Sequence, residues 1–356
     1  MFLAIKEMKH NKFRYTLIVM MIMLISYLIF ILTSLATGLA DANRQAIDTW
    51  HAQTIVLNAD ADGTLRKSSL TTKQAQQIGQ ITSKAALGEL GVTAVKTQTH
   101  HKIAGELLGI NKSEFIYHQL KTSSGHKFKH NFEAVVDQSF ANKDYHLGDR
   151  IKVADNLPKL KIVGFTTKAQ LSVAPVIYTS LSTWRQIKFG GVPIAYSSAI
   201  VLKNNSHLKL DSTLEQLSMA QFIKKLPGYQ AQNLTFEFMI GFLLIITLII
   251  IAIFLYILTI QKLPTFAVLK AQGIPTGYLL KNTVTQALLI TVAGLVCGII
   301  LGILTEIAMP AAVPMSFNYP LLLAAALALL IMSLLGSLIP TRTIKKIDPA
   351  AMIGGN

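Results

Sequence analysis

The sequence predicts a membrane α-helical protein with four transmembrane helices, into which an extracytoplasmic α+β domain is inserted on helical stalks. Two observations predict this class. Hydrophobic residues make up 51% of the 356 residues and charged residues only 14%, whereas a soluble chain carries about 25% charged residues. The apolar residues are also concentrated in four runs of about 20, the length that spans a bilayer, while the long segment between the first two runs is polar.

The four apolar runs divide the chain into segments. Transmembrane helices are predicted at 15–36, 236–260, 283–309 and 320–341. The other main segments are an N-terminal segment, the inserted domain, a loop and a C-terminal tail, at 1–14, 37–235, 261–282 and 342–356. The first run is longer than the apolar part of a signal peptide, which has about 7–15 residues. We therefore expect it to be an uncleaved membrane anchor.

The basic residues near the helix ends predict the orientation, because short loops rich in Lys and Arg stay in the cytoplasm. Such residues precede the first helix, separate the second from the third and follow the fourth: Lys6, Lys9, Lys12, Arg14, Lys262, Lys270, Lys281, Arg342, Lys345 and Lys346. The 310–319 loop contains none. We expect a multi-pass protein of the cell membrane, with both termini in the cytoplasm and the large domain outside the cell.

Most of the net charge of +15 lies in the inserted domain. The 37–235 segment holds 23 of the 33 basic residues and 14 of the 18 acidic ones, which leaves 23 − 14 = +9. A basic surface of this kind binds nucleic acid or anionic lipid. Because the domain is predicted outside the cell, we expect membrane lipid and anionic wall polymer around it, and no nucleic acid.

The inserted domain has the pattern of a mixed α+β fold. Its flanks, 38–50 and 210–227, are predicted to be helical, with Asp211 as the N-cap of the second flank. Short helices are predicted at 69–79 and 138–143. Strands are predicted where short β-branched runs alternate with turn residues, at 53–57, 92–97, 134–136, 150–153, 160–165, 176–179 and 199–202. The lone cysteine, Cys297, lies in an apolar run, so no disulfide holds this domain.

Eight of the nine histidines fall in the inserted domain, which raises the alternative of a metal or haem-iron site. The candidates are the pair His100 and His101, and the i, i+4 pair His126 and His130. The second spacing brings two ligands together only on a helix, and the sequence around it is typical of extended chain. We therefore interpret these histidines as solvated residues and predict no metal site.

The 261–282 loop is predicted to contain a coupling helix, which would seat in a groove of a cytosolic ATPase. Its features are Lys262, the apolar residues Phe266 and Leu269, Lys270, and Gly273, which can adopt the left-handed conformation that ends a helix. The alternative is an ordinary loop helix on the membrane surface. An ATPase subunit is needed because the sequence has no phosphate-binding G-x-x-x-x-G-K-[ST] loop. It also lacks a nucleophile elbow, so we predict no enzymatic activity in this chain, with ATP and Mg²⁺ bound by the partner.

The chain resembles the FtsX/MacB-type (type VII) ABC transporter permeases, and within them the haem-efflux permeases of Gram-positive bacteria (the HrtB type). The resemblance rests on the order of one helix, a large domain and three helices, on the 262–273 segment, on Ile347-Asp-Pro-Ala near the C-terminus, and on Glu133-Ala-Val-Val-Asp and Leu147-Gly-Asp in the domain. It covers essentially the whole chain. Further similarity to the haem-efflux type lies at 13–18, 35–40 and 259–262.

This resemblance implies a homodimer of permeases on a dimer of ATPases, with no permanently bound cofactor. ATP-driven motion would pass through the membrane helices to the outer domains, a mechanism called mechanotransmission. The expected cargo is haem or a similar amphipathic compound, taken from the outer leaflet. One alternative is an FtsX-like transducer that controls an extracellular cell-wall hydrolase. Another, a peptide-antibiotic pump, ranks last because such pumps ordinarily have more than four membrane helices.

The candidate substrate-binding residues are Glu237, Tyr229 and Tyr27. Ionisable residues in membrane segments are costly and point to function, and the predicted spans contain only Glu237 and Glu306. A carboxylate or phenolate can ligate ferric iron, and aromatic rings can stack on a porphyrin. The alternative is that Glu237 and Glu306 meet interfacial water and that Tyr229 belongs to an aromatic belt.

Two features of the sequence depart from a haem-handling pattern. Leu28 and Ile29 are aliphatic at the depth where a soft iron ligand is expected, and the 170–175 segment contains no tyrosine. Another amphipathic compound therefore stays open as the cargo.

Overall fold

The structure is a computed structural model that describes residues 6, 8, 11–78, 83–97, 99–154, 157–192, 194–204, 208–310 and 313–345. The predicted tail beyond residue 345, most of the segment before residue 11, and His207 lie outside the described residues. The chain forms two compact units. One combines the chain up to Gly38 with the chain from Asn233 onward, and the other is Leu39–Gln232.

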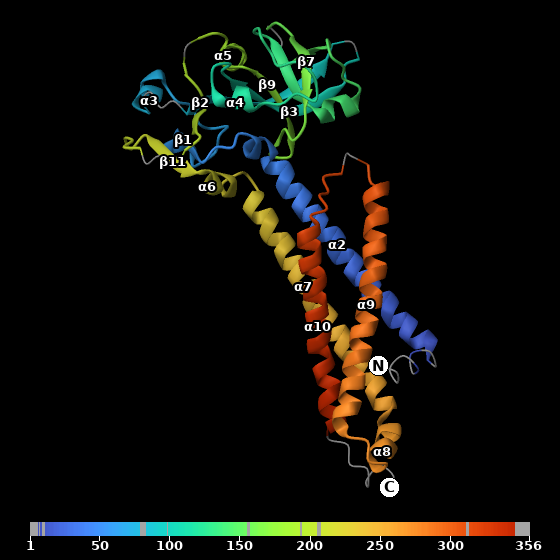
Figure 1. Cartoon of the computed structure of the whole chain (residues 1–356). Coiled ribbons are helices and arrows are strands. Elements are labelled where there is room, and N and C mark those ends of the chain that lie inside the picture. Colours follow the sequence, from blue (N-terminus) through green and yellow to red (C-terminus); the bar gives the residue numbers. More distant parts are fainter. Residues whose placement is uncertain are drawn as a thin grey trace. The chain divides into compact units, whose positions relative to one another are not determined.

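The membrane unit is built from long apolar helices (Figure 1). Within the described residues four helices are long and apolar enough to cross a membrane. They are α2 (Lys12–Thr49), α7 (Tyr229–Gln261), α9 (Thr276–Ala308) and α10 (Tyr319–Lys345), and a short helix, α8 (Leu263–Ala271), follows α7. The helices extend beyond the predicted apolar runs: α2 continues to Thr49, and α7 begins at Tyr229. The predicted fold class is confirmed.

Small residues let two of the membrane helices approach closely. On α9, a Cβ added to Gly294 would lie 2.7 Å from Ile22 Cγ2 of α2, and one added to Gly298 would lie 2.2 Å from Ser26 Oγ. Without a hydrophobic driving force in lipid, helices associate through such close packing and through buried hydroxyl contacts. Thr291 of α9 supplies one, with its hydroxyl 2.6 Å from that of Ser333 on α10.

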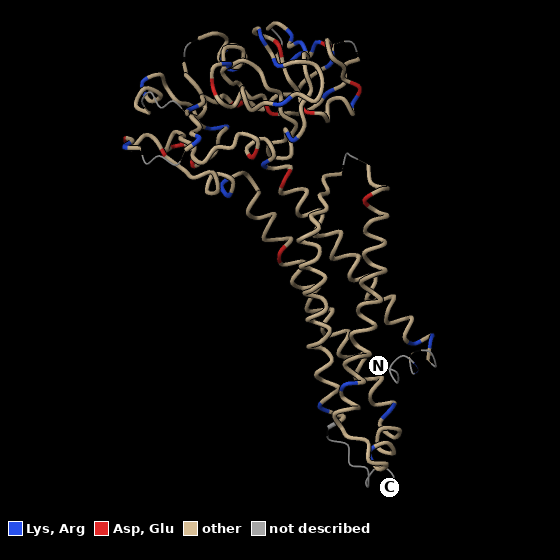
Figure 2. The backbone as a smooth tube through the Cα atoms, in the orientation of Figure 1, with Lys and Arg blue, Asp and Glu red and all other residues tan. Residues whose placement is uncertain are grey.

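The charges of the membrane unit are segregated. Figure 2 shows its basic residues near one end of the helices, whereas α7 and α9 each carry one acidic residue toward the other end. This distribution is the one expected of a helix bundle whose basic end lies in the cytoplasm.

The outer unit is organised around one mixed sheet of eleven strands (Figure 1). Their bounds are β1 Thr54–Asn58, β2 Lys84–Lys96, β3 Lys102–Ile110, β4 Ser124–Gly125, β5 Glu133–Asp137, β6 Arg150–Lys152, β7 Leu160–Thr166, β8 Gln170–Leu171, β9 Ala174–Ser180, β10 Ala199–Leu202 and β11 Leu214–Ser218. The order is β11-β1-β10-β2-β3-β9-β5-β7-β4, with β8 paired to β9. The pairs β3–β9 and β5–β7 are parallel.

Strand β6 pairs with both β2 and β7, so the six strands β2-β3-β9-β5-β7-β6 close into a ring. The apolar side chains inside this ring form one core, which includes Ala94, Ile103, Ile151 and Leu160. Because side chains alternate along a strand, the neighbours of these residues point outward. The ring therefore has a packed interior, and the outward side chains of β3, β5, β7 and β9, such as Leu108, Val135 and Val176, pack into a second hydrophobic core. The outer face is exposed at Arg150 of β6 and Lys161 of β7.

Helices cover the remaining edges of the outer unit. They are η1 (Ala59–Ala61), α3 (Thr72–Gln77), α4 (Phe115–Gln119), η2 (Gln138–Lys143), α5 (Leu181–Phe189) and α6 (Met219–Lys224). Trp184 of α5 is fully buried over two strand glycines, where an added Cβ would lie 2.2 Å (Gly88) and 2.5 Å (Gly109) from its side chain. These glycines pair in register on β2 and β3. The tryptophan side chain can pack this closely against the two strands because neither glycine has a side chain.

The predicted helix at 210–227 is wrong. Residues Leu214–Ser218 form strand β11, which pairs with β1 along its whole length, and only Met219–Lys224 is helical. The strand forms because β1 offers a free edge for its backbone, and Leu214 and Leu217 are buried against the sheet. The helix begins where Ser218 and Gln221 form a capping box. Asp211 is not an N-cap: its carboxylate accepts hydrogen bonds from the Thr213 amide and hydroxyl.

Candidate functional site

Glu237 lies on an exposed face of α7. The neighbouring rings of Phe238 and Phe242 are 65% and 64% exposed. Gly241 follows Glu237 by one helical turn, and a Cβ added there would meet no heavy atom within 4 Å. The helix thus presents a carboxylate beside a gap in its side-chain surface, with the two aromatic rings one turn apart along the same side of that gap. The two phenylalanines and the glycine were not predicted, although their spacing around a membrane carboxylate is visible in the sequence.

The two tyrosines are held elsewhere. The Tyr27 hydroxyl lies 2.9 Å from the Thr305 hydroxyl and links α2 to α9 inside the membrane unit. Tyr229 is half-buried against the core of the outer unit. Among the described residues, no hydrogen bond or ring contact joins either tyrosine to Glu237. Tyr27 is therefore held by Thr305 inside the membrane unit, and Tyr229 belongs to the packing of the outer unit.

Leu28, Ile29 and Glu306, the other membrane residues discussed above, differ in their exposure and contacts. Leu28 is 45% exposed on α2, whereas Ile29 is fully buried in the helix bundle. Glu306 accepts a hydrogen bond from the Tyr319 hydroxyl, at 3.3 Å to one carboxylate oxygen and 3.4 Å to the other. Glu306 thus has a partner within the bundle, which distinguishes it from the exposed Glu237.

The cytoplasmic helix α8 is anchored by its apolar face. Phe266 and Ala267 are buried in a cluster with Leu279 of α9 and Ile344 of α10. The Lys262 ammonium, just before the helix, donates to the Tyr15 hydroxyl at 3.0 Å. These side chains therefore fix α8 to the membrane helices and are not available as a docking surface.

The opposite face of α8 is open. Val268 is 45% exposed, and Tyr278, at the start of α9, is 50% exposed. Between them Gly273 has φ of +87° and ends the helical segment, while Leu269 and Lys270 are half-buried. An exposed aliphatic and an exposed aromatic residue near a helix end suit a protein contact. The sequence did not single these two out, because every third or fourth residue here is apolar.

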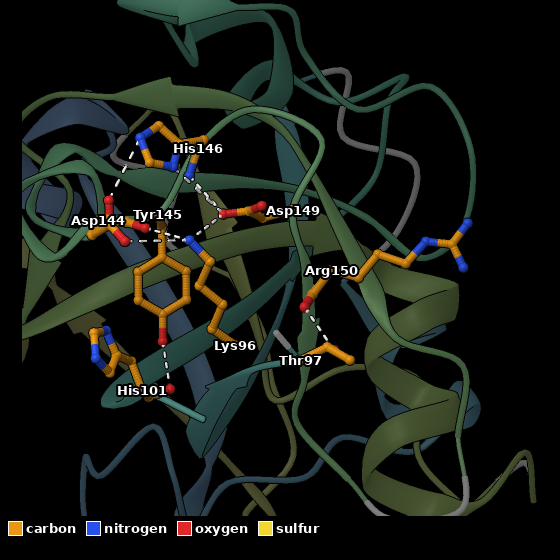
Figure 3. A network of polar contacts seen from close by, with 8 residues as sticks. All are labelled: Lys96, Thr97, His101, Asp144, Tyr145, His146, Asp149 and Arg150. Carbon is orange, nitrogen blue, oxygen red and sulfur yellow. Dashed lines mark hydrogen bonds and ion pairs between the residues drawn. The ribbon is translucent and has the colours of Figure 1, made fainter. Parts of the chain in front are cut away.

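A network of polar contacts surrounds Lys96 at the end of β2 (Figure 3). The buried Lys96 ammonium lies 2.9 Å from Asp149 and 3.8 Å from Asp144, and the Tyr145 hydroxyl donates to the His101 carbonyl at 2.8 Å. Burial raises the pKa of Asp149, but the His146 amide and the Lys96 ammonium donate to its carboxylate and the net pKa is lowered. All its buried members have partners, so the network is structural.

No group of three or more His, Cys, Asp or Glu side chains able to hold a metal occurs among the described residues. The His126 ring nitrogen contacts the Lys127 carbonyl at 2.9 Å, in an extended segment next to β4. This is the extended conformation that the sequence predicts there.

Comparisons with known proteins agree with this architecture. Residues 237–349 match the family model described as FtsX-like permease C-terminal. Over 99% of both chains, the protein is 26% identical to a putative hemin transport system permease protein HrtB of Staphylococcus haemolyticus, and similarly to that of Staphylococcus epidermidis. An uncharacterised ABC transporter permease of Mycobacterium tuberculosis is 22% identical over 100% of this chain and 99% of its own.

One solved structure is also similar, the extracellular domain of the noncanonic ABC-type transporter YknZ from Gram-positive bacteria. It is 14% identical with a TM-score of 0.32, and the match covers 44% of this chain and 83% of that domain.

The membrane topology, the family match over the last three membrane helices and the full-length similarity lead to one conclusion. The protein is the permease of an ABC-type transporter, with an FtsX-like permease domain at 237–349, and is homologous to the HrtB permeases.

Proposed function

We propose that the protein is the membrane subunit of an exporter that removes haem, or a similar amphipathic compound, from the outer leaflet, driven by a separate cytosolic ATPase. The observation that carries this proposal is the exposed Glu237 on an apolar helix. A carboxylate facing lipid is costly and persists where it has a function. The full-length staphylococcal relatives are named as putative hemin transport permeases, and this name supports haem as the cargo class.

The surroundings of Glu237 suit a flat amphipathic ligand. A planar ring system can lie in the gap at Gly241, stacked on Phe238 or Phe242, while the carboxylate ligates a ferric iron or bonds a polar group. Because this face is open, the rest of the site would come from lipid or from a second copy of the chain. We therefore propose a permease homodimer whose cargo binds where the α7 helices meet.

Coupling to the ATPase is proposed at the exposed side of α8. Val268 and Tyr278 would contact the ATPase, while Phe266 and Lys262 hold the helix against the membrane bundle. Leu269, Lys270 and Gly273 complete this segment. A rigidly anchored helix transmits a push to the helices that it touches, whereas a loosely attached loop would absorb it.

Mechanotransmission is supported by the way α2 joins the outer domain. The helix is continuous from Lys12 to Thr49. Within the outer unit, the amides of Ser172 and Val173 donate to the carbonyls of Asn43 and Ala42, at 3.0 and 3.1 Å. The Asn43 side chain also donates to Gln232 of α7 at 3.4 Å. Displacement of α2 would therefore move the β8–β9 hairpin directly.

The alternative, a transducer that controls a cell-wall hydrolase, needs a protein-docking surface on the outer domain. The large apolar side chains exposed on the described part of this domain are few: Leu147, Val173, Val192 and Ile194. Such scattered residues are ordinary for a soluble surface. Transport is the better-supported function.

The test compares two membrane carboxylates. The permease is purified with its ATPase in nanodiscs, and haem is added while the absorption spectrum and ATP hydrolysis are recorded. Glu237→Ala should abolish the haem-dependent spectral change and the stimulation of ATP hydrolysis, whereas the matched control Glu306→Ala should retain both. If the wild type shows neither response, haem is the wrong cargo; if both variants behave like the wild type, Glu237 is not the binding residue.

A further inference from the structure

We infer that the outer domain carries a binding groove for an extended polyanion, specifically a phosphodiester polymer of the cell exterior. The groove lies on the outside of the strand ring, where β2, β6 and β7 meet. It has a volume of about 530 Å³. It is lined by Thr93 and Val95 of β2, by Thr97 and His100 beyond the end of β2, by Lys152 and Lys159, and by the apolar residues Val153, Ala154 and Leu157. We call this feature the β6–β7 groove.

Strand register gathers cations on the outer face of the ring. Arg150 of β6 lies directly opposite Lys161 of β7. On the next strands, Val95 of β2 is paired with Lys152 on one side and Lys102 on the other. Residues paired across strands point to the same face, and the intervening Ile151 and Leu160 point into the core. The positive charges therefore share one surface.

This arrangement works against stability. Like charges directly opposite each other in a sheet are destabilising, and Arg150 faces Lys161 with both side chains exposed. On its other side Lys161 is paired with Glu133 of β5, whose carboxylate accepts hydrogen bonds from the Lys129 and His130 amides. The Asp144 and Asp149 carboxylates contact Lys96 on the other side of the strands. Figure 3 shows the Arg150 side chain extending away from that network. An anion bound between the cations would relieve the repulsion.

The shape of the groove favours a single polymer chain over a membrane surface. A concave groove admits a narrow chain, whereas a planar bilayer touches protruding residues. Charged positions repeat about 7 Å apart along each strand and about 5 Å apart across the pair. A polymer with one phosphate per short repeat can place successive charges over successive rows. The Thr93 hydroxyl of β2 adds a hydrogen-bond donor to the lining of the groove.

The test uses the full chain in nanodiscs of uncharged phosphatidylcholine, with end-labelled poly(glycerol phosphate) as the probe. Binding is followed by fluorescence anisotropy across a salt series. The groove variant replaces four cations: Arg150→Gln, Lys152→Gln, Lys159→Gln and Lys161→Gln. The matched control removes four exposed lysines elsewhere on the same domain: Lys67→Gln, Lys121→Gln, Lys203→Gln and Lys224→Gln.

The groove variant should bind at least about tenfold more weakly near physiological salt, and its slope of log affinity against log salt should fall by about 3, at about 0.7 per lost phosphate contact. The control should stay close to the wild type. In the double variant Arg150→Gln, Lys161→Gln, the slope of log affinity against log salt should fall by about half as much as in the four-residue variant. This double variant should also melt at a higher temperature than the wild type, because it removes an opposed like-charge pair.

Three results would overturn the inference. Equal losses in the groove variant and the control would show attraction by net charge alone. Binding of phosphatidylglycerol vesicles that depends on the groove, without binding of the polymer, would make the ligand a lipid surface. Competition by inorganic phosphate as strong as that by the polymer would show a site for one anion only. None of these outcomes depends on the cargo at Glu237.

Discussion

The substitution Glu89→Gln should remove a pH-dependent loss of folding stability from the outer domain. Glu89 of β2 and Glu106 of β3 are 3% and 5% exposed. The Arg66 guanidinium bridges them, with its Nε 3.5 Å from Glu89 Oε1 and a second nitrogen donating to Glu106. Burial, followed by the hydrogen bond with Glu106, raises the pKa of Glu89 to about 8. One cation thus serves two buried carboxylates, and the raised pKa keeps Glu89 protonated at neutral pH.

The sign of the effect follows from proton linkage. Between the ordinary glutamate pKa and the raised one, the folded state holds a proton that the unfolded state has lost, so stability falls as pH rises. The pKa rises from 4.5 to about 8, and 3.5 pH units at 1.36 kcal/mol each set an upper limit of about 5 kcal/mol. We expect about 2 kcal/mol, because Arg66 is 63% exposed and can move toward the second carboxylate.

Tryptophan fluorescence reads out this domain within the full-length protein. The chain has two tryptophans, and both Trp50 and Trp184 are buried in the outer unit. Urea unfolding is followed from about pH 5 to 8.5 for the wild type, Glu89→Gln and a control, Glu133→Gln. The control should keep the wild-type slope there, because the Lys129 and His130 amides outweigh burial and lower the pKa of Glu133.

The expected result is a wild-type stability that declines between pH 5 and 8 and a Glu89→Gln stability that does not. At pH 8 the variant should be the more stable protein. Parallel curves for the wild type and Glu89→Gln would refute the reasoning from the raised pKa of Glu89, and so would a variant that is less stable at every pH.

Three further predictions concern packing, strain and charge. Val173 has φ of +64° at the tip of the β8–β9 hairpin and is 43% exposed; Val173→Gly should stabilise by about 1 kcal/mol, as relief of strain exceeds the entropic cost of glycine, and a fall in the urea midpoint would contradict this. Gly298→Ala places a Cβ 2.2 Å from Ser26 Oγ and should cost about 1–3 kcal/mol, seen as earlier thermal aggregation in detergent. Gly302→Ala, where an added Cβ meets nothing within 4 Å, should be neutral or stabilising. The lowered pKa of Asp149 gives stability that is present above its unfolded pKa and lost as pH falls through the folded one; Asp149→Asn should lack this acid-side loss, and a wild-type acid transition unchanged by the substitution would count against it.

Helix α8 shows which features of a functional segment can be predicted from a local sequence pattern. Phe266 and Gly273 were both expected in a coupling helix, and Gly273 does end it in the left-handed conformation. Phe266, however, is buried against Leu279 and Ile344, and the exposed positions are Val268 and Tyr278. An amphipathic pattern shows that a helix has an apolar face. It does not show which neighbour covers that face.

The same limit applies to the strands. Residues 102–110 were not predicted as a strand because Gly105, Glu106 and Gly109 interrupt the apolar pattern, yet β3 is one of the longest strands. Gly109 is needed there because Trp184 occupies the place of its side chain, and Glu106 is tolerated because Arg66 reaches it. Both reasons involve residues distant in the sequence.

The sequence by itself determined the four membrane helices, their orientation and the mixed fold of the outer domain. A run of about 20 apolar residues is long enough to span the bilayer, and short loops rich in Lys and Arg stay in the cytoplasm; both are local properties of the sequence. Only the tertiary structure decided that β6 closes a ring, that cations of the strands beside β2 share its outer face, and that the Tyr27 hydroxyl is held by Thr305. These depend on strand register and helix packing, which arise from contacts between segments far apart in the chain.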